Sequence, residues 1–355
     1  MLDTGVDGGH PHFASGTLTD LSVRDLHRDL TWLVRDEPPP RRPAPSRGLV
    51  DGDGHGTHVA GIIAGAQPTA RPACLATLAP AAGDEGGIPD WAPRDLPAGR
   101  MLSGVAPMAR IVSLKVLDST GQAPRTTSSA VIMALEHVRT VNSGGRLLRI
   151  HGVNLSLGCP WFYRDYAAGQ SPLCRELDLL VGTGVVAVVS AGNGGHTLDG
   201  GGPTGVLSSI TDPGNAHRVI TVGSTHRDRP HTFGVSYLSS KGPTLDGRLK
   251  PDVVAPGERI TSCATGAFRA GIPVFDGLPV RGPAAPACYA EDSGTSMAAP
   301  HVSGAIAALM SVRPEFVGRP DEVKRIVTST AISLGRDRFF EGHGLIDLMG
   351  VLAHI

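Results

Sequence analysis

The sequence is poor in aromatic residues and in lysine. It contains only 3 Trp, 4 Tyr and 8 Phe among 355 residues, whereas hydrophobic residues make up 41%. We therefore expect a core built from Ala, Val, Ile and Leu. Lys and Arg total 32, the formal net charge is −1, and the arginines are scattered along the chain, so no nucleic-acid partner is indicated. The only lysines are Lys115, Lys241, Lys250 and Lys324.

The chain also lacks the marks of a membrane segment and of a zinc site. No apolar run approaches the roughly 20 residues of a membrane span, and the opening MLD shows no signal peptide. Its five cysteines form no CxxC and no Cys/His spacing typical of zinc, so no metal site is predicted from them. In a secreted protein Cys159 with Cys174, and Cys263 with Cys288, could each close a surface loop. In a reducing compartment these four and Cys74 would be free thiols.

Apolar segments alternate with amphipathic ones along the chain. This alternation predicts one α/β domain over residues 1–355, with a parallel sheet covered on both faces. Three Gly- or Pro-rich stretches, 36–47, 67–100 and 265–287, are expected as loop insertions without secondary structure. Strands are predicted at 110–117, 152–157, 185–190, 217–222 and 252–255, and helices at 126–141, 173–183, 296–312 and 320–330.

Segment 292–304, DSGTSMAAPHVSG, places a serine at the start of an apolar helix. Free backbone N–H groups and the positive end of the helix dipole surround a hydroxyl at that position. The setting suits a nucleophile whose attack creates an oxyanion, although capping the helix is the common role of such a serine. Taken alone, the segment leaves both interpretations of Ser296 open.

Segment 51–65, DGDGHGTHVAGIIAG, carries two histidines among closely spaced glycines. We interpret His55 as a general base, because imidazole titrates near neutral pH. The glycines at 52, 54 and 56 predict close backbone packing around it. A metal pair of His55 with His58 is the alternative, but it lacks the usual spacing and a further ligand.

Two further segments could complete such a site. In LDTGVDGGHPHF at 2–13, Asp3 precedes Thr-Gly and could hold a buried carboxylate against an imidazole. In VVSAGNG at 188–194, the side-chain amide of Asn193 could donate a hydrogen bond to a developing oxyanion. A plain turn asparagine is the alternative for Asn193.

Together the four segments resemble the signatures of the subtilisin-like serine proteases, the subtilases. DTGVD surrounds the Asp, HGTHVAG the His, SAGN the Asn and GTSMAAPHVSG the Ser, in the chain order Asp, His, Ser. The resemblance covers nearly the whole chain apart from the three loops. Further matching segments are GVAPMARIVSLKVLDSTG at 104–121, NLSLG at 154–158, KPDVVAPG at 250–257 and GHGLIDL at 342–348.

The resemblance implies a subtilisin-like three-layer α/β sandwich, with a mostly parallel sheet of about seven strands between helices. It implies peptide-bond hydrolysis through an acyl-enzyme, with Ser296 as nucleophile, His55 as base and Asp3 holding His55. The Ser296 N–H and the Asn193 amide would form the oxyanion hole. Substrate would bind as an added strand with broad, apolar-leaning specificity, since no acid is visible in the matching segments. The implied substrate-binding residues are Gly121, Gln122, Ala123, Ser156, Leu157, Gly158, Ala191 and Gly192.

The start of the chain departs from the family pattern. Subtilases carry an apolar strand immediately before the catalytic Asp, whereas only two residues precede Asp3 here. We therefore expect the first strand to be missing and Asp3 to lie on a frayed terminus. The same difference suggests that the sequence is an N-terminally truncated version of a longer precursor.

Calcium binding is the second departure. His12 takes the place of an Asp that many subtilases use in a tight site, and residues 98–103 lack their Asn-rich loop. No cofactor is required by the resemblance. A weak Ca²⁺ site near 211–217 and Asp252 remains as an expectation.

The resemblance also implies partners and a location. The expected partners are protein or peptide substrates and a propeptide outside this chain, and we expect a monomer that is secreted or extracytoplasmic. Two alternatives within the family are a catalytically inactive binding module and a peptide macrocyclase, in which an amine replaces water on the acyl-enzyme. A metal-dependent hydrolase using His55 and His58 is the alternative outside it.

Overall fold

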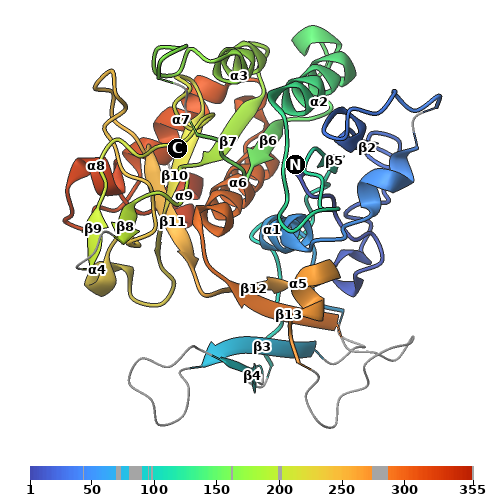
Figure 1. Cartoon of the computed structure of the whole chain (residues 1–355), viewed down its shortest axis with the longest axis horizontal. Helices are drawn as coiled ribbons and strands as arrows, with labels where there is room; N and C mark the ends of the chain where they lie inside the picture. The colour runs from blue at the N-terminus through green and yellow to red at the C-terminus, as the bar shows by residue number, and fades with distance from the viewer. Residues whose placement is uncertain are drawn as a thin grey trace.

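A seven-stranded parallel sheet forms the centre of the computed structural model, in the order β11-β10-β7-β6-β1-β5-β2 (Figure 1). Each pair of neighbouring strands in it is parallel, which confirms the predicted sheet. The structure describes residues 1–42, 44–68, 73–79, 90–94, 96, 99–160, 163–198, 202–273 and 287–353. The strands are β1 (Leu2–Asp3), β2 (Arg28–Asp29), β5 (Leu114–Lys115), β6 (Gly152–Leu155), β7 (Val186–Ser190), β10 (Ile220–His226) and β11 (Val253–Glu258).

Strand β7 shows how the sheet is buried on both faces. Val186 and Val188 point into one apolar cluster, and Ala187 and Val189 point into another on the opposite face. Successive side chains of a strand alternate between faces, so a strand between two helical layers must be apolar at every position. The run VVAVVS meets this requirement.

Helices cover both faces of the sheet. On one face lie α2 (Ser128–Val141) and α3 (Pro172–Gly182), and on the other lies α6 (Thr295–Val312) with α7 (Pro320–Ser329). None of the described helices is both long and apolar enough to cross a membrane. The other α-helices are α1 (His55–Ile63), α4 (Pro230–Phe233), α5 (Gly266–Ala270), α8 (Arg338–Glu341) and α9 (Leu348–Ala353). Single 3-10 turns occur at Pro11–Phe13, Thr31–Leu33, Pro45–Leu49, Ser143–Gly145 and Pro314–Phe316.

A second, four-stranded sheet projects from the body in the order β12-β13-β3-β4 (Figure 1). Its strands are β3 (Ala73–Ala79), β4 (Asp90–Arg94), β12 (Ile260–Cys263) and β13 (Ala287–Asp292). The expectation that 67–100 lacks secondary structure is therefore wrong: β3 pairs with β13 from a distant part of the chain and with its neighbour β4.

Two smaller differences concern the other loops and the cysteines. The segment 265–287 contains α5, and its residues 274–286 lie outside the described residues. Strands β8 (His196–Leu198) and β9 (Pro203–Gly205) form a separate hairpin. Cys159, Cys174 and Cys263 are free thiols, so neither of the two disulfides that were considered is formed.

The start of the chain is ordered within the sheet. Leu2 pairs with Leu114 on one side and with Leu155 on the other. The Met1 ammonium donates a hydrogen bond to the Val112 carbonyl at 2.8 Å, and Asp3 is fully buried. The expected frayed terminus is therefore wrong, because a two-residue strand held on both sides fixes Asp3 in the centre of the sheet.

Candidate active site

Asp3 lies at the carboxyl end of the central strand β1. Its Oδ1 accepts one hydrogen bond from the His55 ring nitrogen Nδ1, at 2.7 Å, and another from the Thr4 backbone N–H, at 2.8 Å. The side chain is completely buried, and its Oδ2 has no hydrogen-bond partner among the described residues. A buried carboxylate that engages Nδ1 fixes the ring orientation and leaves Nε2 to act on a substrate.

His55 begins α1 and is 25% exposed. Burial alone would lower its pKa, but the charge and hydrogen bond of Asp3, with help from Asp292 and Asp53, raise the pKa to about 9. The ring is therefore strongly stabilised in its protonated form. That is the form which a general base reaches after it has taken a proton.

Asp51 organises the start of α1, and it was not predicted from the sequence as a site residue. Its buried carboxylate accepts hydrogen bonds from the Gly54 N–H at 2.9 Å, the Thr57 hydroxyl at 2.6 Å and the Thr4 hydroxyl at 2.9 Å. Thr4 Oγ1 in turn accepts the Gly56 N–H at 2.9 Å. The network ties the turn that carries His55 to the residue after Asp3. In the sequence, the only indication of this role is that an acidic residue stands four positions before His55.

Two of the three glycines near His55 allow close backbone approach, as predicted. A Cβ at Gly56 would lie 2.1 Å from the Gly5 carbonyl oxygen, and one at Gly54, whose φ is +114°, would lie 2.4 Å from the Thr265 carbonyl oxygen. Helix α1 can therefore approach Asp3 and Gly5 only because Gly56 has no side chain, and Gly54 allows the same close approach of Thr265. Gly52 has ordinary contacts.

Ser296 lies in the first turn of α6, and its hydroxyl donates to the Ser156 carbonyl oxygen at 3.2 Å. Ser156 returns a hydrogen bond from its own hydroxyl to the Ser296 carbonyl at 2.8 Å. No hydrogen bond joins Ser296 to His55 among the described residues. The structure thus brings Asp3 and His55 together, while the Ser296 hydroxyl is directed at the end of β6.

Asn193 follows β7, and Thr295 fixes the orientation of its amide. The Asn193 Oδ1 accepts hydrogen bonds from the Thr295 N–H at 3.0 Å and from the Thr295 hydroxyl at 2.9 Å. With the carbonyl side engaged, the Nδ2 side of the amide is left to donate to another group, and Asn193 is exposed. Thr295 was not predicted from the sequence as a site residue, although it directly precedes Ser296.

The predicted substrate-binding residues lie in three segments. Ser156 and Leu157 follow β6 and are buried, whereas Gly158 is exposed. Thr211 packs against two glycines: a Cβ at Gly158 would lie 2.4 Å, and one at Gly192 2.6 Å, from its hydroxyl oxygen. Ala191 is fully buried beside them. The third segment, Gly121, Gln122 and Ala123, forms an exposed bend between the paired residues Asp118 and Arg125.

The expected cation site near Asp252 does not fit Ca²⁺. The Asp252 carboxylate is held by the Lys250 ammonium at 2.6 Å and the Lys324 ammonium at 2.9 Å. The Asp212 Oδ1 accepts a hydrogen bond from the Asn215 side-chain amide at 2.9 Å. Two ammonium groups on one carboxylate leave no place for a hard cation, which needs several free oxygen ligands.

His58 does not join His55 in a shared site. Its Nε2 lies 3.1 Å from the Ala290 carbonyl oxygen, whereas the His55 ring faces Asp3. Within the described ranges, no three His, Cys, Asp or Glu side chains are grouped so that they could hold a metal ion. His12 is buried too, with Nδ1 3.1 Å from the Tyr289 hydroxyl, and burial first of all lowers its pKa, to about 4.

The candidate site residues converge at one edge of the sheet. Asp3, Ser156 and Asn193 follow the carboxyl ends of three neighbouring strands, β1, β6 and β7, the edge at which open α/β sheets bind ligands. This fold and site define the class of subtilisin-like serine endopeptidases, which are hydrolases. The chain belongs to the subtilase family, whose family model matches residues 1–345.

Individual relatives agree with this assignment. Pyrolysin of Pyrococcus furiosus is 31% identical over 330 residues, which cover 84% of this chain and 21% of pyrolysin. Subtilisin E of Bacillus subtilis is 28% identical over 348 residues, 98% of this chain and 63% of that protein. Fervidolysin from Fervidobacterium pennivorans, a keratinolytic enzyme related to subtilisin, superposes with a TM-score of 0.62 at 25% identity, over 99% of this chain and 41% of fervidolysin. This chain therefore spans only part of each of these relatives.

Proposed function

We propose that the chain hydrolyses peptide bonds through an acyl-enzyme on Ser296. The Ser296 hydroxyl attacks the scissile carbonyl while His55 Nε2 takes its proton, and the C–N bond breaks as His55 returns that proton to the amine. Water, deprotonated by His55, then releases the acid and restores Ser296. Asp3 holds the His55 ring and stabilises its cation.

The observation that carries this proposal is the Asp3–His55 pair. An Oδ1–Nδ1 distance of 2.7 Å with a fully buried carboxylate is the arrangement expected of a base that must become cationic. In the structure without substrate, the Ser296 hydroxyl donates to Ser156 at 3.2 Å. Attack requires this hydroxyl to rotate toward His55, and loose nucleophile–base contacts are common before substrate binds.

An oxyanion hole made by Asn193 and the Ser296 N–H accounts for charge stabilisation. Thr295 engages the Asn193 Oδ1 and leaves its Nδ2 to donate to a substrate, and the Ser296 N–H lies in the first turn of α6. Removal of one such hydrogen-bond donor typically lowers turnover by about 10²–10³-fold. The carbonyl group of the scissile peptide bond would lie between these donors and the Ser296 hydroxyl.

The substrate is proposed to be an extended protein or peptide segment with apolar side chains. Leu157, Ala191 and Gly192 supply apolar walls, and the nearby Asp212 carboxylate is engaged by Asn215. Residues 121–123 and 156–158 would flank the peptide as strands. We further propose, from the family relationship, a single monomeric peptidase domain over 1–355 that acts outside the cytoplasm and is preceded by a propeptide in its precursor.

Labelling with a fluorophosphonate probe tests the activity. We expect the chain to be labelled, Ser296→Ala to be unlabelled, and Ser311→Ala, a change on the exposed side of the same helix, to be labelled like the parent. Peptide cleavage followed by mass spectrometry should show addition of water, whereas a macrocyclase product would show none. A folded parent chain that takes no label would support the inactive binding module instead.

A further inference from the structure

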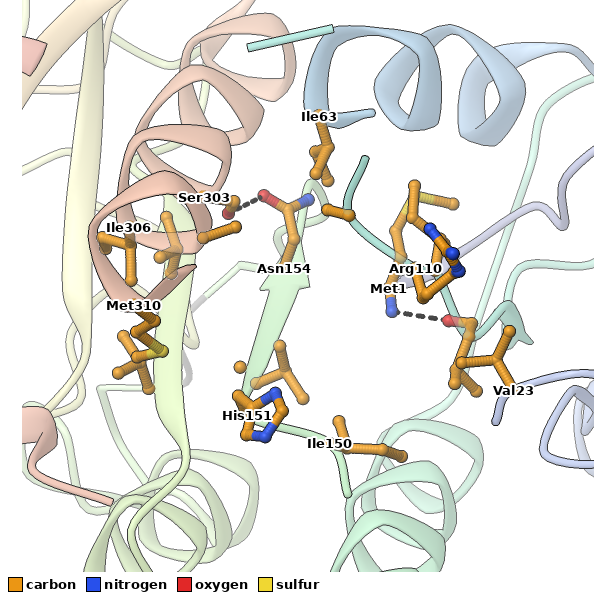
Figure 2. A pocket seen from close by; sticks show the side chains of 18 of the residues that line it. Met1, Val23, Ile63, Arg110, Ile150, His151, Asn154, Ser303, Ile306 and Met310 are labelled. Carbon is orange, nitrogen blue, oxygen red and sulfur yellow. Dashed lines mark hydrogen bonds between the residues drawn. The ribbon is translucent and has the colours of Figure 1, made fainter. Parts of the chain in front are cut away.

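Asn154 is a buried amide in the otherwise apolar strand β6. It is 3% exposed, and its neighbours Val153 and Leu155 pack into the apolar cluster under α2 and α3. Successive side chains of a strand alternate between faces, so Asn154 points to the opposite face, which α6 covers. Figure 2 shows its side chain facing Ser303 of α6. A buried amide needs hydrogen-bond partners, and the partners of Asn154 indicate what it does.

Three hydrogen bonds link Ser303 through Asn154 and Ser156 to Ser296. The Asn154 Oδ1 accepts a hydrogen bond from the Ser303 hydroxyl at 2.8 Å, and its Nδ2 donates to the Ser156 hydroxyl oxygen at 3.0 Å. The Ser156 hydroxyl donates in turn to the Ser296 carbonyl oxygen at 2.8 Å. Because Asn154 occupies the Ser156 hydroxyl oxygen as a donor, the single proton of that hydroxyl is left for Ser296. Asn154 thus sets the direction in which the Ser156 hydroxyl donates.

The Ser296 carbonyl group needs this donor because of Pro300. In an α-helix the carbonyl of residue 296 would accept a hydrogen bond from the N–H of residue 300. Residue 300 is a proline inside α6, so it has no N–H, and its ring crowds the Ser296 carbonyl. The Ser156 hydroxyl therefore supplies from β6 the hydrogen bond that the helix itself cannot make.

The backbone of Ser296 determines where two proposed functional groups lie. These are the hydroxyl that attacks the substrate and the N–H that contributes to the oxyanion hole, and both belong to the first turn of α6. Two hydrogen bonds in opposite directions connect Ser156 with Ser296, at 2.8 and 3.2 Å. If the Ser296 carbonyl lost its donor and turned, the hydroxyl and the N–H would move with it. A displacement of about 1 Å can slow a reaction by about 10²-fold.

Packing alone would favour an apolar side chain at position 154. Val188, the register partner of Asn154 in β7, belongs to the apolar cluster between the sheet and α6. Exchanging buried hydrogen-bonded groups for apolar ones of the same shape can be nearly neutral for stability. A polar residue that departs from the local pattern is expected chiefly at functional sites, so the amide calls for an explanation other than stability.

We propose that Asn154 and Ser303 are positioning residues for Ser296. They act through the Ser156 hydroxyl on the Ser296 carbonyl, which Pro300 leaves without a donor from the helix. This role rests on the proposed function, in which Ser296 is the nucleophile. Because both residues act on the backbone of Ser296 and not on the substrate, they should affect kcat and leave KM unchanged.

Peptide hydrolysis and the rate of fluorophosphonate labelling of the full chain test this role. Asn154→Leu should lower kcat and the labelling rate by roughly tenfold, with KM unchanged within about twofold. Ser303→Ala should lower both rates by about threefold, because Asn154 keeps its bond to Ser156 but loses the hydroxyl that orients it. Ser303→Thr returns a hydroxyl and should restore both rates. Ser311→Ala removes a hydroxyl at an exposed position of the same helix and should match the parent.

Pro300→Ala separates positioning of Ser296 from a general effect on the fold. Alanine returns an N–H at residue 300, which can bond to the Ser296 carbonyl within α6, so the Ser156 donor is no longer required. In the Pro300→Ala background, Asn154→Leu should therefore change the labelling rate by less than about twofold, against roughly tenfold in the parent. A general loss of packing at residue 154 would slow labelling equally in both backgrounds.

Three results in an active parent chain would overturn the positioning role. They are parent-like kcat in both Asn154→Leu and Ser303→Ala, an equal loss with and without Pro300→Ala, and a raised KM at constant kcat, which would indicate substrate binding. If Asn154→Leu does not unfold cooperatively in urea, the comparison of Ser303→Ala with Ser303→Thr takes its place. A folded parent chain that neither takes the label nor cleaves peptides would reject the proposed function itself, and the positioning role with it.

Discussion

At the scale of single residues, Asp3 is the charged neighbour with the largest effect on the pKa of His55. Burial alone would lower the pKa of the ring, and the Asp3 carboxylate outweighs that effect and brings the pKa to about 9. A general base must be neutral before it accepts the serine proton, so the reactive fraction grows as the pH rises toward this value. In the proposed mechanism, Asp3 therefore controls both the orientation of the ring and the pH range of activity.

Replacing Asp3 by Asn should lower turnover by roughly 10⁴-fold. Asn no longer holds the His55 ring in the tautomer that leaves Nε2 free to accept a proton, and it no longer stabilises the His55 cation by its charge. The acid limb of kcat/KM in the residual activity should move to lower pH, by about 1–3 units, since the opposing charge that raised the pKa is gone. Peptide hydrolysis measured from pH 5 to 10 tests both. Asp53→Asn is the control, because the Asp53 charge raises the pKa of His55 less than Asp3 does, and the Asn side chain can still accept the hydrogen bond from the His55 N–H. An unmoved acid limb in Asp3→Asn would contradict this assignment.

Thr295 offers a second residue-scale prediction. Thr295→Val removes the hydroxyl that holds the Asn193 Oδ1 at 2.9 Å, so the amide can turn its donors away from the substrate. We expect kcat to fall by roughly tenfold, less than the 10²–10³ for losing such a donor outright, with KM little changed. Thr295→Ser should restore kcat, because it returns the hydroxyl. A loss of stability without any change in kcat would show that Thr295 is only structural.

Sequence patterns named the residues that are proposed to perform the chemistry, but not Asp51 and Thr295, which position them. Asp3, His55, Asn193 and Ser296 stand in segments whose composition is unusual, and each has a role that its own side chain suggests. Asp51 acts through hydrogen bonds to residues near and far along the chain, including Thr4. A network of that kind becomes visible only after folding has brought its members together.

At the scale of elements, the contact between α1 and β1 sets the distance from His55 to Asp3. Gly56→Ala would place a methyl group 2.1 Å from the Gly5 carbonyl oxygen and 3.1 Å from the Asp3 Cβ. The helix must then shift, which we expect to cost about 1–3 kcal/mol of unfolding free energy and to reduce kcat strongly. Urea unfolding and peptide hydrolysis measure the two effects.

The matched control for this change is Gly205→Ala in β9. A Cβ at Gly205 meets no atom within 4 Å, so stability and activity should stay close to those of the parent. If Gly56→Ala were as active as Gly205→Ala, close approach of α1 to β1 would not be needed for catalysis.

Elements with local signals were predictable, and elements that depend on distant partners were not. The helix expected at 296–312 is α6 at Thr295–Val312, and the strand expected at 185–190 is β7 at Val186–Ser190, because each has a continuous apolar pattern. Strand β3 is also apolar, with the sequence ACLATLA, but it is a short run, and one of its two partners is β13, in which Cys288 pairs in register with Cys74 far along the chain. Gly- and Pro-rich surroundings concealed this pairing.

At the scale of the whole molecule, the amino terminus is a structural part of the central sheet. The Met1 amine ordinarily has a pKa of 8.0, and burial lowers it to about 5 although Asp3 acts in the opposite direction. Between these values the unfolded chain binds a proton that the folded chain does not. The free energy of unfolding therefore rises with pH from 5 to 8 through this group. As the pH falls through that window, folding must increasingly remove a proton from the amine, and the free energy of unfolding decreases.

Acetylation of the Met1 amine should remove this pH dependence, because the amide cannot ionise while it keeps an N–H for the Val112 carbonyl at 2.8 Å. The acetylated chain should gain stability relative to the free chain as the pH falls from 8 to 5, by at most about 4 kcal/mol at 1.36 kcal/mol per pKa unit. Urea unfolding of both forms at several pH values measures the difference, in which the titration of His55 and other shared groups cancels. A constant difference across the window would mean that the amine is not buried, and that the first strand leaves the sheet in solution.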